Sequence, residues 1–99
     1  MIINKTIENG CLTFALEGRL DTNTAPLLET AIISAFDEAK KVVMDFSSLA
    51  YVSSAGLRVL LNSQKMATDK GVPMILTRVS EEIMDVFDMT GFSDILTIE

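Results

Sequence analysis

Apolar and polar residues alternate along the first sixteen positions, which is typical of strands that bury one face. The alternation is interrupted by Asn9-Gly10, the pair most typical of a tight type I′ turn. The pattern therefore predicts a β-hairpin with one buried face. The alternating positions are Ile3, Lys5 and Ile7 before the turn and Leu12, Phe14 and Leu16 after it.

The spacing of apolar residues then changes to that of a helix. Thr22, Asn23 and Thr24 are candidate helix caps, and Pro26 is tolerated in a first turn because its missing N–H has no partner there. Downstream, apolar residues recur three or four positions apart and predict an amphipathic helix. This stripe consists of Leu28, Ala31, Ile32, Ala35, Phe36 and Ala39.

The middle of the chain predicts a strand followed by a second helix. Residues 42–44 (VVM) form an unbroken apolar run that ends at Asp45, as expected of a parallel strand covered on both faces. The second helix begins at Ser54 and closes with Lys70 and Gly71, a residue that readily adopts a left-handed conformation. Its expected buried positions are Leu57, Leu60, Leu61 and Ala67.

The last third predicts strand, helix and strand. Residues 73–77 read as a strand, and Ser80 with the acidic Glu81 and Glu82 is typical of a helix start. Gly91 ends this helix, and residues 95–98 predict a short closing strand. The order ββαβαβαβ predicts an α/β fold, with residues 1–99 as one domain and a mixed, mostly parallel sheet packed with helices. The buried stripe of the third helix would be Ile83, Val86 and Phe87.

Composition excludes several classes of function. The net charge of −6 would repel a phosphate backbone, so nucleic acid is a poor partner. The chain has no histidine, which excludes a Ser-His-Asp triad and histidine-bearing zinc sites, and its single Cys11 cannot form an internal disulfide. We therefore expect no enzyme activity, no catalytic residues, no metal and no cofactor.

Hydropathy and the amino terminus indicate where the chain resides. No stretch approaches the roughly 20 apolar residues that a membrane-spanning helix needs, so membrane insertion is not expected. Residues 1–8 lack the basic and apolar regions of a signal peptide. A cytoplasmic location is the resulting expectation.

The most informative stretch is residues 45–57 (DFSSLAYVSSAGL), which places serines and a glycine between a strand and a helix. On spacing alone, the simplest interpretation is that Ser53 or Ser54 is a helix cap worth roughly 1 kcal/mol. A phosphate at the same place would add about −1.5 to −2 charges where free N–H groups and the helix dipole favour an anion. A modification there could leave the fold intact and change the charge of a binding surface.

These residues resemble a known family. The chain is similar to a STAS domain of the bacterial anti-sigma factor antagonist type over nearly its whole length. The strongest match is residues 45–49 (DFSSL) followed by residues 51–57 (YVSSAGL), and residues 18–21 (GRLD) and 87–92 (FDMTGF) add to it.

The resemblance implies a protein switch. The unphosphorylated antagonist binds an anti-sigma factor that is also an ATP-dependent serine kinase, and so frees a sigma factor. Phosphorylation of the serine that carries over to Ser54 releases the complex, and a PP2C-type phosphatase reverses it. Ser53 is the less favoured acceptor; it stands where the family often has aspartate. The partner-binding residues implied are Asp21, Thr22, Ser53, Ser54, Ala55, Gly56, Leu57 and Arg58.

Two other readings differ in class. One is a constitutive STAS docking subunit of a transporter or stress-signalling complex that uses the same surface without phosphorylation. The other is an enzyme with Ser54 as nucleophile, which is disfavoured because residues 52–56 (VSSAG) lack the first glycine of a nucleophile elbow.

Overall fold

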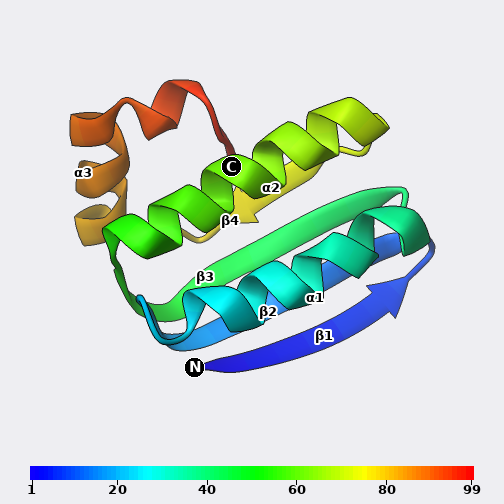
Figure 1. The fold of residues 1–99 in the computed structure, drawn as a ribbon, viewed down its shortest axis with the longest axis horizontal. Helices are drawn as coiled ribbons and strands as arrows, with labels where there is room; N and C mark the ends of the chain where they lie inside the picture. The colour runs from blue at the N-terminus through cyan, green and yellow to red at the C-terminus, as the bar shows by residue number, and fades with distance from the viewer.

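The computed structural model describes all 99 residues and has the predicted element order (Figure 1). A five-stranded sheet packs with three α-helices, and a short 3₁₀ helix precedes the last strand. The elements are β1 (Ile2–Glu8), β2 (Cys11–Leu20), α1 (Ala25–Glu38), β3 (Lys41–Val52), α2 (Ser54–Lys70), β4 (Met74–Thr77), α3 (Glu81–Thr90), η1 (Phe92–Asp94) and β5 (Thr97–Ile98).

The predicted hairpin is confirmed, but only its second strand has a fully buried face. Asn9 and Gly10 have φ values of 53° and 81°, as a type I′ turn requires. The alternating residues of β2 are buried, whereas in β1 Ile3 is half-buried and Ile7 is exposed. The reason is position, because β1 is an edge strand that α1 does not cover (Figure 1).

The strand order explains why the helices cover one face of the sheet. The order is β1-β2-β3-β4-β5, with β1 and β2 antiparallel and the other neighbours parallel. Parallel strands are joined by right-handed crossovers, and when each new strand adds on the same side, those crossovers place their helices on the same face. Figure 1 shows α1 and α2 together in front of the sheet.

This topology corrects two expectations for β3. The run of residues 42–44 is not covered on both faces, because Val42 and Met44 are buried while Val43 is only half-buried on the face without helices. The strand also does not end at Asp45 but continues to Val52, with shifts in its register against β2. The predicted long loop is therefore mostly strand, and a single residue, Ser53, separates β3 from α2.

The predicted stripe of α1 is buried except for half-buried Ala31, and in α2 the predicted Leu60 and Ala67 are buried. Leu57 and Leu61 are half-buried, and small residues at Gly56 and Ser63 take core-facing positions, which lets the helix approach the sheet closely. The buried residues of α2 are Gly56, Val59, Leu60, Ser63 and Ala67.

Helix α3 begins and ends as predicted and closes the carboxyl end of the sheet. Ser80 Oγ accepts a hydrogen bond from the Ile83 N–H at 3.3 Å, and Gly91 ends the helix with a φ of 81°. Ile83 and Phe87 are buried, while Val86 is half-buried. The closing strand is shorter than residues 95–98, because η1 precedes it and only two residues of β5 pair with β4.

Candidate functional site

The carboxyl ends of β2 and β3 meet the start of α2 and form the candidate site. Leu20 lies beside Val52 in the parallel register. The next residue, Ser53, donates its N–H to the Leu20 carbonyl at 2.8 Å. This bond ties the end of β2 to the N-cap residue of α2, so Asp21 and Ser53 each directly follow one of two neighbouring strand ends. The structure thus brings together the two segments that the sequence predicted as a binding surface.

Gly56 allows the close approach at this junction. A Cβ atom at position 56 would lie 2.8 Å from Leu20 Cγ, 2.9 Å from the Leu20 carbonyl oxygen and 3.1 Å from Val52 Cγ1. Real Cβ atoms essentially never come closer than 3.0 Å to such neighbours. The position therefore requires glycine for packing.

The two serines have different environments. Ser53 is the N-cap residue of α2: it is half-buried, has extended backbone angles, and its Oγ accepts a hydrogen bond from the Gly56 N–H at 3.2 Å. Ser54 is the first residue of the helix, is exposed, and its hydroxyl makes no hydrogen bond within the chain. The first turn of α2 carries no acidic side chain. The cap is therefore Ser53, and Ser54 presents a free hydroxyl at a helix N-terminus.

Asp21 organises the turn before α1. Its Oδ1 accepts hydrogen bonds from the backbone N–H of Asn23 at 3.0 Å and of Thr24 at 3.1 Å. Thr24 Oγ1 in turn accepts from the Asp21 N–H at 2.8 Å. The Thr24 N–H, above all, lowers the pKa of the Asp21 carboxyl below 3.8, and the Asn23 N–H, the Thr24 hydroxyl and the Arg19 charge act in the same direction. Asp21 is thus an ionised turn residue with its Oδ1 already engaged.

Arg19 and Tyr51 were not predicted as site residues. They are paired in the register of β2 and β3, and the Arg19 guanidinium lies over the Tyr51 ring at 4.2 Å from its centroid. Arg19 Nε is also 3.8 Å from Asp21 Oδ2. The sequence held no signal for this pair, because it depends on a strand register that includes two irregular shifts.

The remaining predicted binding residues surround the serines. Thr22 and Arg58 are exposed, and Ala55 and Leu57 are half-buried. No group of three or more cysteine, aspartate or glutamate side chains is placed to hold a metal ion. None of the helices combines the length and hydropathy that a membrane crossing requires.

The lowered pKa of Asp21 gives a pH prediction. A carboxyl whose pKa is lower in the folded than in the unfolded chain contributes stability above the unfolded value, and that stability is lost as the pH falls through the folded value. Because asparagine resembles the protonated carboxyl, Asp21→Asn should be less stable than wild type at pH 7, and this difference should be smaller at pH 3, which lies below the ordinary pKa of an aspartate. Urea unfolding at both pH values measures this, and a difference that does not change with pH would contradict it.

Comparison with known proteins shows which family the chain resembles. The model of the STAS domain matches residues 3–99. BtrV of Bordetella bronchiseptica, described as an anti-sigma factor antagonist, is 31% identical over 91 residues, which is 91% of this chain and 78% of BtrV. The anti-sigma-B factor antagonist of Bacillus subtilis is 28% identical over 83 residues, or 84% of this chain and 76% of that protein.

Solved structures share the fold. The anti-sigma factor antagonist SpoIIAA in its unphosphorylated form has a TM-score of 0.83 at 17% identity, covering 99% of this chain and 88% of that one. SpoIIAA of Bacillus in the phosphorylated form has a TM-score of 0.78, also at 17% identity, covering 99% and 91%. A sulfate transporter family protein of Wolinella succinogenes has a TM-score of 0.79 at 17% identity, covering 91% and 74%. The match of the family model over residues 3–99 shows that this chain belongs to the STAS domain family.

Proposed function

We propose that this chain is an anti-sigma factor antagonist whose unmodified form binds an anti-sigma factor with serine kinase activity and so frees a sigma factor. The observation that carries the proposal is the division of roles between two adjacent serines. Ser53 is occupied as the helix cap, while the exposed Ser54 hydroxyl is free to accept a phosphoryl group. The relatives named as anti-sigma factor antagonists at 28–31% identity support the same function.

The proposed switch is electrostatic. The kinase would transfer the γ-phosphoryl group of ATP to Ser54 Oγ, with loss of the hydroxyl proton and release of ADP. The product would carry about −1.5 to −2 charges at the N-terminus of α2, where the dipole tolerates an anion and the first turn has no acid to repel it. The fold would therefore survive modification while the binding surface changes charge. The phosphorylated SpoIIAA structure, which shares this fold, supports that compatibility.

In this proposal the chain is a cytoplasmic regulator, not an enzyme. A PP2C-type phosphatase would remove the phosphate and restore binding. The partner surface would include Asp21 and Thr22 before α1 together with residues 53–58, two segments that follow directly from the neighbouring ends of β2 and β3.

The test is intact-mass analysis after incubation with ATP and the cognate anti-sigma kinase. Wild type should gain one phosphate, Ser53→Ala should still gain it, and Ser54→Ala should not. Ser53→Ala should lose about 1 kcal/mol of stability because it removes the cap, so its modification must be measured well below its Tm. A phosphate retained on Ser54→Ala would refute the assignment of Ser54. In a binding assay, Ser54→Asp should weaken the complex with the kinase by about tenfold or more, since a like charge placed in an interface costs more than 1 kcal/mol.

The alternative function is a constitutive docking subunit that uses the same surface without modification. The fold shared with a sulfate transporter family protein favours this candidate. It predicts no phosphate on wild type when the same kinase preparation modifies another antagonist. Genomic neighbours also separate the two, because an ATPase kinase or PP2C gene favours the antagonist and transporter genes favour the docking subunit.

A further inference from the structure

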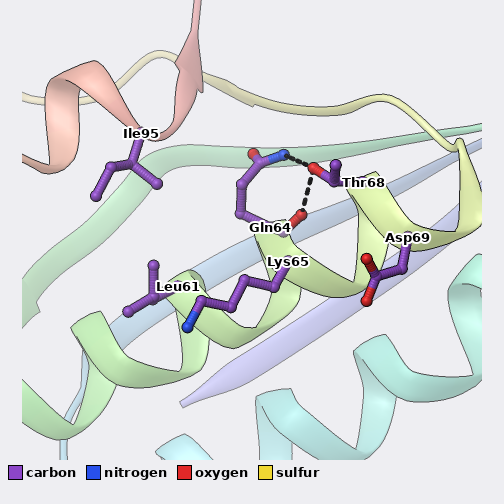
Figure 2. A pocket seen from close by; sticks show the side chains of 6 residues that line it. All are labelled: Leu61, Gln64, Lys65, Thr68, Asp69 and Ile95. Carbon is purple, nitrogen blue, oxygen red and sulfur yellow. Dashed lines mark hydrogen bonds between the residues drawn. The ribbon is translucent and has the colours of Figure 1, made fainter.

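A shallow groove lies beside the outer face of α2. It has a volume of about 510 Å³ and is open to solvent. Figure 2 shows that Leu61 and Ile95 supply its apolar walls from α2 and from the segment before β5. We call it the α2 groove, and its lining residues are Leu61, Gln64, Lys65, Thr68, Asp69 and Ile95.

The α2 groove is continuous with the proposed binding surface. Ser54, Arg58, Leu61 and Lys65 are spaced at i, i+4, i+7 and i+11 and so form one stripe along α2. At 1.5 Å per residue, Leu61 lies only about 10 Å along the helix axis from Ser54. A partner docked on Ser54 over an interface of standard size, about 800 Å² a side, would therefore reach this groove.

The charge of α2 is opposite to that of the whole chain. The chain carries −6, whereas α2 has three basic residues, Arg58, Lys65 and Lys70, and one acidic residue, Asp69. Lys70 pairs with Asp37 on α1, but Arg58 and Lys65 take part in none of the four ion pairs. The stripe that leads from Ser54 to the groove therefore presents two unpaired cations.

Gln64 adds an unsatisfied acceptor to the groove. Its side-chain N–H₂ donates to Thr68 Oγ1 at 3.4 Å, while its Oε1 is buried and has no hydrogen-bond partner. In Figure 2 this oxygen points to the Ile95 side of the groove. Buried acceptors are nearly always paired in native proteins. After a small rotation of the Gln64 amide, a hydrogen-bond donor of a docked partner would supply the missing bond to Oε1.

We propose that the anti-sigma kinase inserts an aliphatic side chain between Leu61 and Ile95 and places acidic side chains beside Arg58 and Lys65. This inference rests on the proposed function. The groove is too open to enclose most of a small molecule, whereas an aliphatic anchor with an acidic surround matches its walls and its charges. The same arrangement explains why phosphorylation would weaken the binding of the kinase and not strengthen it. A phosphate on Ser54 would place negative charge at the end of a stripe that attracts acidic groups.

Calorimetric titration of purified cognate kinase with variants of the full chain tests the anchor. Ile95→Gln should weaken binding about tenfold, as expected for an apolar hot-spot contact. The matched control is Ile7→Gln, because Ile7 is similarly exposed (56% against 47% for Ile95) but lies on the edge strand β1. Ile7→Gln should bind as wild type does. In the complex, the methyl resonances of Leu61 and Ile95 should shift while those of Ile7 should not.

The charge part of the proposal has its own test. Lys65→Glu should weaken binding about tenfold at low salt and less at high salt, because screening reduces the effect of an exposed charge. If Ile95→Gln and Lys65→Glu bound the kinase as tightly as wild type while Ser54→Asp still lost binding, the α2 groove would not be part of the interface. The proposed function would then still stand. If wild type and Ser54→Asp bound the kinase equally, or if neither bound it, both the groove proposal and the proposed function would be refuted.

Discussion

Replacing Phe87 with alanine is expected to lower the free energy of unfolding by about 3–5 kcal/mol. Phe87 is fully buried and packs against Phe46 of β3, with ring centroids 6.4 Å apart and an angle of 52° between the ring planes. Helix α3 has only one other buried residue, Ile83. The helix therefore depends mainly on Phe87 and Ile83 for its attachment to the sheet.

Such a loss is a large part of the total stability of about 5–15 kcal/mol that is usual for a domain. It should lower the Tm by roughly 15–30 °C. Urea unfolding followed by circular dichroism measures the change. Met89→Ala is the matched control, since Met89 lies on the same helix but is 82% exposed, and its replacement should cost less than about 0.5 kcal/mol. Similar losses for the two variants would show that α3 is not anchored through Phe87.

Gly56→Ala should lower the free energy of unfolding by about 2 kcal/mol net. The added Cβ would overlap Leu20 Cγ and, more seriously, the Leu20 carbonyl oxygen, which accepts the Ser53 N–H. Overpacking costs about 1–3 kcal/mol, and displacing the carbonyl weakens a hydrogen bond worth about 1 kcal/mol. The gain of about 1 kcal/mol from removing a glycine inside a helix offsets only part of this cost.

Because the clash lies at the first turn of α2, the variant should also shift Ser53 and Ser54. We expect phosphorylation of Ser54 to slow, measured by intact mass against time at a temperature where the variant is folded. Gly71→Ala is the control, since its Cβ would meet no atom within 4 Å and only the φ of 67° opposes it. That control should cost about 1 kcal/mol and leave phosphorylation unchanged. A Gly56→Ala variant more stable than Gly71→Ala would contradict the packing argument.

Much of the fold, and the place of two serines at the start of a helix, followed from local patterns in the sequence. Asn9-Gly10 defined the hairpin because a type I′ turn needs two residues that tolerate positive φ. Ser80 and Gly91 marked the ends of α3 because a cap and a left-handed terminator act within one turn of the chain. Ser53 and Ser54 were located as a pair at the start of a helix.

The tertiary structure decided the features that depend on contacts between distant segments. Residues 42–44 could not reveal that β3 is covered on one face only, because this follows from the strand order of the whole sheet. The choice of Ser53 as cap required the backbone angles at the β3–α2 junction. Arg19 lies over Tyr51 through a strand register with irregular shifts. Leu61 and Ile95, which are 34 positions apart in the sequence, line one groove only in the folded chain. Local propensity specifies elements and caps, whereas the face that an element buries is set by the packing of its neighbours.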